Sequence, residues 1–158
     1  MTNFQEIGRL EFTSNRVPND IITLSRSTKF IRIVFSGSPN VSSAGIQIRL
    51  NGDTGSNYPR RLQTRDGAGT QWQEDTGTSL MNVGVQPANA PCYMWSEIAK
   101  TSNGWAGQWG LSGAFDGTTF RIGSITWTST SNITTITVGS SQNSTWKSGT
   151  TIIVYGHD

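Results

Sequence analysis

Hydrophobic residues occupy every second position in several short stretches of the first third of the chain. The clearest stretch covers residues 45–50, where Ile46, Ile48 and Leu50 alternate with polar side chains. A side-chain period of two is typical of a strand that buries one face. Three other stretches alternate in the same way and predict these inward positions: Leu10 and Phe12 in residues 7–12, Ile22 and Leu24 in residues 20–24, and Ile31, Ile33 and Phe35 in residues 30–35.

The last third of the chain continues the pattern with one interruption. Phe120 and Ile122 lie on one predicted face, and the next apolar pair, Ile125 and Trp127, lies on the other. We place a β-bulge at Gly123, between the two pairs, because a bulge inserts one extra residue into a strand. The remaining apolar positions that predict strands here are Ile133, Ile136, Val138 and the run over residues 150–155.

The middle of the chain, residues 65–117, gives a weaker signal because many Gly residues and two Pro residues interrupt it. Residues 93–99 are the best strand candidate there, with Tyr93, Trp95 and Glu97 on one face. A long structureless loop is uncommon in a compact domain, so we expect short strands and ordered loops in this region. No segment keeps a 3.6-residue apolar period, and we expect little helix.

The first and last blocks together predict seven or eight strands, and the short strands of the middle belong to the same single domain, which spans residues 1–158. The fold class is all-β, with a two-sheet antiparallel sandwich of jelly-roll type. Composition agrees, because Ser and Thr make up roughly a quarter of the chain and Gly contributes 18 residues. Six Trp, six Phe and three Tyr are far more aromatic surface than a disordered chain carries.

Charge and hydropathy narrow the expected partners. The net charge is +2, and the only cluster of basic residues is Arg60, Arg61 and Arg65. Nucleic-acid binding usually needs a larger basic patch, so we do not expect a nucleic-acid partner. The chain has no run of 18 or more apolar residues, so we expect no membrane span. The first residues lack a basic region leading into an apolar run, so we expect a protein made without a signal peptide.

The residue types that enzymes use for catalysis are few in this chain, and they do not form combinations typical of an active site. The single histidine, His157, and the single cysteine, Cys92, offer no nucleophile–base pair, and Cys92 is expected to be a small buried residue. Glu74 and Asp75 are adjacent, so on a strand they would face opposite ways. We therefore predict no enzymatic activity, no catalytic residue and no cofactor.

The loop at residues 51–57, NGDTGSN, has two interpretations. Asp53 could ligate Ca²⁺, since carboxylate, amide and carbonyl oxygens are hard donors. The loop lacks the regular acidic spacing of a calcium site, and Asn-Gly is a preferred tight-turn pair because both residues tolerate positive φ. We favour the turn and predict no metal ligand.

The candidate contact surface consists of Trp105, Trp109, Arg60 and Arg61. The two tryptophans flank a Gly-containing stretch, where an exposed indole could stack on a host-surface glycan or anchor a protein partner. The alternative interpretation is that both indoles cap the open end of the sandwich, and we favour it. Arg60 and Arg61 are also explained by a solvated loop.

Residues 46–58, IQIRLNGDTGSNY, resemble a pattern found in structural proteins of tailed bacteriophages, in which an alternating strand runs into an N-G-D-T-G-x-N-Y turn. The C-terminal GTTIIVYG, residues 149–156, resembles the closing strand of virion β-domains. In the pattern a Trp-His pair often follows the tyrosine, where this chain has Pro59-Arg60-Arg61, so we carry over no role tied to that pair.

The resemblance implies a non-enzymatic virion component that is made in the host cytoplasm. A compact single domain without coiled-coil or collagen-like repeats suits a head decoration, or cement, protein better than a fibre. Its expected partners are the major capsid protein or tail proteins, and such proteins are commonly trimers, so we expect a homo-oligomer. The alternative is a tail fibre, receptor-binding or carbohydrate-binding module that acts in host adsorption.

Overall fold

The computed structural model describes residues 3–41, 44–66, 69–86, 88–113, 120–140 and 143–158. Within these ranges the chain forms twelve strands and no helix. The strands are β1 (Gln5–Glu11), β2 (Asn19–Thr23), β3 (Phe30–Gly37), β4 (Ala44–Leu50), β5 (Tyr58–Asp66), β6 (Gly69–Gly77), β7 (Met81–Gln86), β8 (Cys92–Thr101), β9 (Gly104–Gly113), β10 (Phe120–Trp127), β11 (Thr135–Ser140) and β12 (Thr151–His157).

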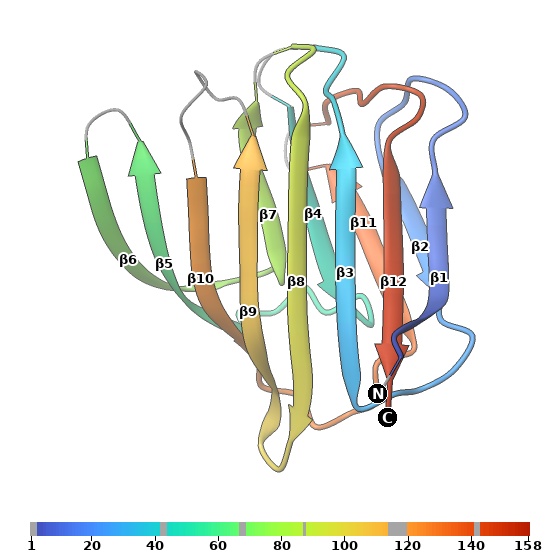
Figure 1. The fold of residues 1–158 in the computed structure, drawn as a ribbon, viewed down its shortest axis with the longest axis vertical. Coiled ribbons are helices and arrows are strands. Elements are labelled where there is room, and N and C mark those ends of the chain that lie inside the picture. The colour runs from blue at the N-terminus through green and yellow to red at the C-terminus, as the bar shows by residue number, and fades with distance from the viewer. Residues whose placement is uncertain (1–2, 42–43, 67–68, 87, 114–119, 141–142) are drawn as a thin grey trace.

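The strands form two antiparallel sheets, which confirms the all-β fold class. The larger sheet has the order β1-β12-β3-β8-β9-β10-β5-β6, and the smaller has the order β2-β11-β4-β7. Figure 1 shows the smaller sheet behind the larger one, with β2 opposite β1 and β7 opposite β9. Strands β5 and β6 extend beyond the edge of the smaller sheet.

The core contains the alternating residues that the sequence places inward. Ile46, Ile48 and Leu50 of the smaller sheet are fully buried, and they belong to the same hydrophobic cluster as Ile33 and Phe35 of the larger sheet. Burying one aliphatic side chain contributes roughly 1.5–3 kcal/mol. The other predicted inward residues that are buried are Phe12, Ile22, Leu24, Ile31, Ile125, Trp127, Ile133, Ile136 and Val138, while Leu10 is partly buried.

The middle of the chain differs from the sequence-based expectation. Outside this region the seven stretches with a strand pattern correspond to β1–β4 and β10–β12, and β5 is an eighth strand, so the predicted number is confirmed. Within the region β8 and β9 are each ten residues long, so the short strands expected there are wrong. The strand predicted at residues 93–99 is confirmed as part of β8. Its residues Cys92, Met94, Ser96 and Ile98 are buried, and Tyr93, Trp95 and Glu97 share the opposite, more exposed face.

The β-bulge predicted at Gly123 is wrong. β10 pairs with β5 and β9 without a register shift, so Ile122 and Ile125 face opposite sides simply because they are three residues apart. Gly123 is required for a different reason: a Cβ there would lie 2.2 Å from the carbonyl oxygen of Arg61 on β5. Phe120 was predicted to share a face with Ile122, but its side chain lies outside the described part of the structure.

The NGDTGSNY segment leads from the smaller sheet to the larger one. Asn51 and Gly52 have positive φ values of 50° and 68°, and the Asp53 N–H donates to the Leu50 carbonyl at 3.0 Å. These features define a type I′ turn, which confirms the turn interpretation. The phenol oxygen of Tyr58, which is fully buried at the start of β5, accepts a hydrogen bond of 3.0 Å from the Leu50 N–H.

The Asp53 carboxylate is an internal acceptor in this segment. Its Oδ1 accepts from the Gly55 N–H at 2.9 Å, its Oδ2 accepts from the Trp127 indole N–H at 2.7 Å, and Asn57 donates to both oxygens. Partial burial alone would raise the pKa of Asp53, but these hydrogen bonds stabilise the anion and lower it below 3.8. The segment therefore ties the turn after β4 to β10 of the larger sheet.

No helix among the described residues is long and apolar enough to cross a membrane.

Candidate functional site

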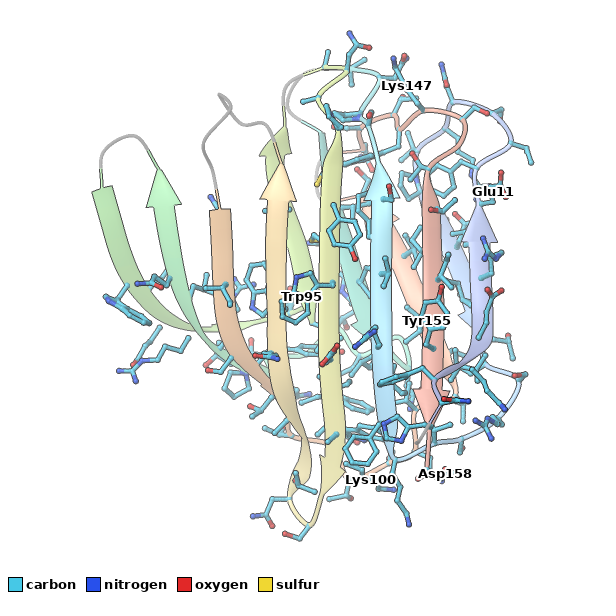
Figure 2. The ribbon with its side chains drawn as sticks, viewed as in Figure 1. Glu11, Trp95, Lys100, Lys147, Tyr155 and Asp158 are labelled. Atoms are coloured by element: carbon cyan, nitrogen blue, oxygen red, sulfur yellow. The ribbon has the colours of Figure 1, made fainter. Side chains whose placement is uncertain are left out.

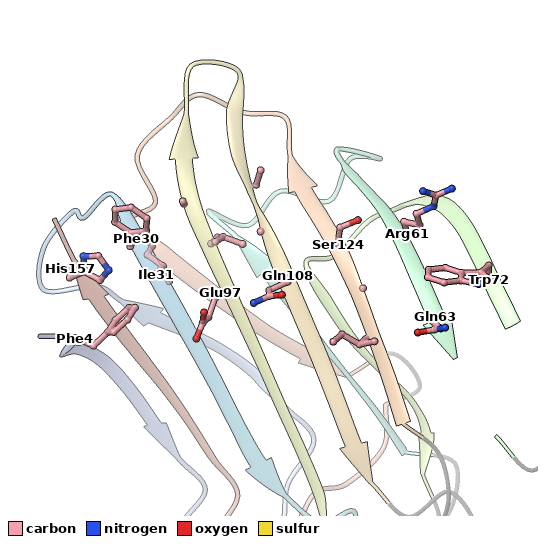
Figure 3. Close-up of a pocket in the computed structure, with 16 residues that line it drawn as sticks. Phe4, Phe30, Ile31, Arg61, Gln63, Trp72, Glu97, Gln108, Ser124 and His157 are labelled. Carbon is pink, nitrogen blue, oxygen red and sulfur yellow. The ribbon is translucent and has the colours of Figure 1, made fainter. Parts of the chain in front are cut away.

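A groove of about 700 Å³ lies on the face of the larger sheet that points away from the smaller sheet. Its lining side chains come from β3, β5, β6, β8, β9, β10 and the two chain ends. Figure 2 shows Trp95 and Tyr155 on this same outer face. In Figure 3 the groove runs across the strands, with Phe4, Phe30 and His157 at one end and Trp72 at the other.

A row of side chains in strict cross-strand register follows the groove. Glu97 on β8 pairs with Gln108 on β9, and Gln108 pairs with Ser124 on β10. Successive register partners share one face of a sheet, because side chains alternate along every strand. The complete row takes one residue from each of the eight strands: Glu6, Tyr155, Arg32, Glu97, Gln108, Ser124, Arg61 and Glu74.

Both arginines of this row form ion pairs with a carboxylate on the next strand. The Arg32 Nε atom lies 2.6 Å from Oε1 of Glu97, and the Arg61 Nε atom lies 2.6 Å from Oε1 of Glu74. Each guanidinium also faces an aromatic ring, with 4.6 Å from Arg32 Cζ to the centre of Phe4 and 6.0 Å from Arg61 Cζ to the centre of Trp72. Within the row, the two ion pairs therefore flank the neutral side chains of Gln108 and Ser124.

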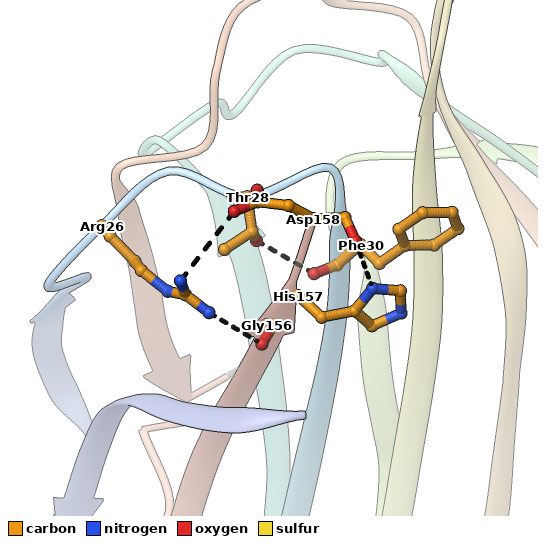
Figure 4. A network of polar contacts seen from close by, with 6 residues as sticks. All are labelled: Arg26, Thr28, Phe30, Gly156, His157 and Asp158. Atoms are coloured by element: carbon orange, nitrogen blue, oxygen red, sulfur yellow. Dashed lines mark hydrogen bonds and ion pairs between the residues drawn. The ribbon is translucent and has the colours of Figure 1, made fainter. Parts of the chain in front are cut away.

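One end of the groove is an aromatic cluster. The His157 ring stacks on Phe30 with 4.3 Å between centroids and an angle of 14°, and it meets Phe4 edge-on at 4.5 Å. Two side chains contact backbone carbonyls at this end of β12, as Figure 4 shows: the Arg26 guanidinium donates to the Gly156 carbonyl at 3.4 Å, and His157 Nδ1 lies 3.1 Å from the Asp158 carbonyl. Phe30 keeps 41% of its surface exposed.

The other end of the groove is formed by Trp72 on the edge strand β6. Its side chain is 67% exposed, which is unusual for so large an apolar group. Trp72 pairs in register with Gln63 on β5, whose side chain also lines the groove.

The floor between the two ends is built from small residues. Ala99 on β8 and Ala106 on β9 are register partners, and Gly107 follows Ala106. A Cβ at Gly107 would lie 1.8 Å from the carbonyl oxygen of Glu97, so only glycine fits this backbone approach. Small side chains leave space above the sheet, which explains why the groove lies over β8, β9 and β10.

The structure separates the four residues of the predicted contact surface. Trp105 and Trp109 are only 1% and 2% exposed, so the hypothesis of an exposed indole at either position is wrong. Their side chains alternate inward along β9 and join the core, where the Trp105 indole N–H donates to the Ser131 carbonyl at 3.0 Å. Arg61 lines the groove, and Arg60 and Arg61 both line a shallower hollow of about 520 Å³ beside it.

Sequence reasoning missed Phe30, Trp72 and Gln108 as site residues. A signal was present at Phe30, because a large aromatic residue stood on the predicted outer face of an alternating strand. No such signal marked Trp72, whose strand contains no alternating apolar residues. The register that brings Gln108 between Glu97 and Ser124 follows only from the tertiary structure.

Two carboxylates of the row, Glu97 in the groove and Glu74 in the neighbouring hollow, are far apart in the sheet. Glu97 and Glu74 lie four strands apart, and at about 4.8 Å per strand their separation is on the order of 19 Å. The two carboxylates of a glycosidase lie within about 10 Å of each other. Among the described residues no group of three or more His, Cys, Asp or Glu could hold a metal ion.

Cys92, at the start of β8, is buried as expected. Burial raises the pKa of its thiol to about 12, which leaves it protonated at neutral pH.

No family model matches this chain, and no curated protein matches it either.

Proposed function

We propose that the two sheets form a jelly roll with four added strands. When β5, β6, β9 and β10 are left out, eight strands remain and can be counted from first to eighth in chain order. The larger sheet then has the order β1-β12-β3-β8, which are the first, eighth, third and sixth of these strands. The smaller sheet has the order β2-β11-β4-β7, which are the second, seventh, fourth and fifth. This is the order of two Greek keys wound together, and all pairings are antiparallel, which supports the jelly roll.

We further propose that the protein is a non-enzymatic structural component of a tailed bacteriophage virion, displayed on the head as a decoration protein. The observation that carries the proposal is the NGDTGSNY segment, because the residues that give the resemblance are also those that join the two sheets. Jelly rolls are frequent in viral capsid proteins and in lectins, and this fold-level analogy adds support. Its partners are then the major capsid protein and further copies of itself, as a homo-oligomer such as a trimer.

Localisation in purified particles tests this proposal. Gold-labelled antibodies against the protein, with antibodies against the major capsid protein as the positive control, are imaged by electron microscopy on particles purified from the same lysate. We expect label distributed over the head in proportion to the capsid label. Absence of the protein from particles overturns the virion assignment, and label restricted to the tail overturns the decoration assignment.

A second candidate is a role in host adsorption, from a position on the tail. The outer-face groove favours it, because exposed aromatic rings beside hydrogen-bonding side chains are suited to ligand contact. Antibodies raised against the groove face discriminate between the two functions. They should block adsorption of particles to cells if the groove contacts the host, and they should leave adsorption unchanged for a purely structural decoration.

A further inference from the structure

We propose that the outer-face groove binds a neutral oligosaccharide, with Trp72 as a stacking platform at one end, the stacked Phe30–His157 pair as the aromatic contact at the other, and Gln108 and Gln63 as hydrogen-bonding groups. This inference deepens the host-adsorption candidate but does not depend on where the protein lies in a particle. Three properties of the described residues carry it: exposed aromatic rings, uncharged polar side chains between them, and pairing of the charges around them.

The first property is the exposure of two aromatic rings at opposite ends of one groove. Trp72 and Phe30 are 67% and 41% exposed, whereas the indoles of Trp105 and Trp109 are buried in the core. Exposed apolar surface marks contact sites when it is gathered in one place, and both rings border the same groove together with apolar residues of its floor. A sugar ring presents an apolar C–H face, which packs on a flat aromatic ring in the same way as other apolar groups.

The second property is the chemistry of the groove between these rings. Gln108 and Ser124 are exposed and adjacent in register, and Gln63 lies two residues from Arg61 along β5, on the same face. An amide side chain offers both donors and an acceptor, and a serine hydroxyl offers both as well. Sugar hydroxyls also donate and accept, so this set of side chains can form hydrogen bonds with them while the apolar lining packs against the sugar rings.

The third property is charge. The arginines of the row, Arg32 and Arg61, each lie beside a carboxylate, Glu97 and Glu74 respectively. Each pair is neutral in sum, so neither of these two arginines offers an uncompensated guanidinium to a sulfate, carboxylate or phosphate group. Charge complementarity therefore favours a neutral saccharide over an anionic one.

The length of the groove favours an oligosaccharide over a single sugar. Phe30 on β3 and Trp72 on β6 are separated by five strand spacings, which correspond to about 24 Å along the sheet. Contact with both aromatic ends at the same time requires a chain of several sugar rings. The small residues Ala99 and Ala106 leave the centre open for it.

A glycan array with the isolated protein is the first test. The array carries neutral glycans built from glucose, galactose, mannose and N-acetylhexosamines, beside sialylated, sulfated and uronic-acid glycans. We expect binding to neutral oligosaccharides of several rings, and we expect the monosaccharides to bind at least tenfold more weakly. Binding confined to anionic glycans, or no binding to any neutral glycan, overturns the proposal.

Variants then place the bound glycan in the groove. For the best neutral glycan, calorimetry should show affinity lowered about tenfold or more by Trp72→Ala and by Gln108→Ala, and largely retained by Trp72→Phe, because a phenyl ring still stacks. Ile21→Ala is the matched control, since Ile21 is 69% exposed on β2 of the other sheet. If Trp72→Ala and Gln108→Ala bind as well as the Ile21→Ala control, the groove is not the site.

The two proposals fail independently of each other. Loss of the glycan signal in these variants leaves the location of the protein in particles unaffected, and absence from particles leaves the array result unaffected. A circular dichroism spectrum of each variant that matches the unsubstituted protein excludes unfolding as the cause of lost binding.

Discussion

Asp53 shows how a single side chain joins the two sheets. Its carboxylate accepts hydrogen bonds from the turn that follows β4 and from the indole of Trp127 on β10. Trp127 is buried, so its N–H would have no access to water if Asp53 were removed. Leaving one buried donor without a partner costs about 1–3 kcal/mol, which makes Asp53 a residue of structural importance despite its position in a loop.

The ionisation of Asp53 should make part of the stability depend on pH. Its pKa in the folded protein is below the value of 3.8 expected for the unfolded chain, so the anion stabilises the fold above pH 3.8, and this contribution is lost as pH falls through the folded pKa. In Asp53→Asn the contribution is absent. We expect the difference in unfolding free energy between the two proteins, measured with urea, to be largest near neutrality and to shrink below pH 3.8. A difference that is constant with pH would contradict this explanation.

Cys92 should be unreactive in the folded protein. Its thiol is buried, and the pKa of about 12 leaves almost no thiolate at mildly alkaline pH. We expect a chromogenic disulfide reagent to label no thiol in the native protein within minutes, and to label one thiol per chain after unfolding in guanidinium chloride. Rapid labelling without denaturant would show that the N-terminal end of β8 opens readily.

At the scale of elements, the close pairing of β10 with β5 depends on glycine. A methyl group at Gly123 would lie 2.2 Å from the Arg61 carbonyl oxygen, and the strands would have to move apart. We expect Gly123→Ala to lower the unfolding free energy by about 1–3 kcal/mol, as overpacking usually does.

Gly139 on β11 provides the matched control for this prediction. The atom nearest to a Cβ added at Gly139 would be Nη1 of Arg49, at 3.6 Å, which is an ordinary contact distance. Gly139→Ala should therefore change stability by less than about 0.5 kcal/mol. Equal urea midpoints for the Gly123 and Gly139 variants would mean that the β10–β5 pairing adapts freely.

The strands that the sequence predicted are those that bury aliphatic residues on one face. β3 and β4 alternate clearly because their inward residues are isoleucine, leucine and phenylalanine. β5 and β6 extend beyond the smaller sheet, so few of their positions need to be apolar, and their sequences YPRRLQTRD and GTQWQEDTG carry no strong period. β9 was hidden for a different reason, since its glycines look like loop residues although they lie on the strand.

The candidate site was less predictable than the fold. Arg61 was recognised as a contact residue, but the two tryptophans chosen with it are core residues. The sequence shows that an aromatic residue is present, and only the alternation along β9 decides which way it points. The row from Glu97 to Arg61 runs over the consecutive strands β8, β9 and β10 and then to β5, which is distant in the chain, so the position of Arg61 beside Ser124 is a property of the tertiary fold.

At the scale of the whole molecule, the pairing of the first and last strands closes the fold. β12 lies between β1 and β3, and its residues Ile152 and Val154 are fully buried. Deleting residues 151–158 removes the partner of both neighbouring strands, and we expect the truncated chain to lose cooperative thermal unfolding.

Removing Asp158 alone is the control for this truncation. Asp158 is exposed, and its side chain contributes an ion pair with Arg26 at 3.9 Å. Exposed pairs of this kind contribute about 0–1 kcal/mol, so a melting temperature close to that of the full chain is expected. A cooperative transition in the longer deletion would show that the remaining strands fold without β12.

The two chain ends also lie beside one another at one end of the groove, where Phe4 and His157 are in contact. A peptide tag or fluorescent protein fused to either end would therefore be tethered next to that aromatic cluster and could obstruct access to it. The loop between β8 and β9 is short, and its residues Ser102 and Asn103 are exposed. Immobilising the protein for surface-based measurements is better done through a label introduced on the far sheet, at Ile21, so that the outer face stays open to solution.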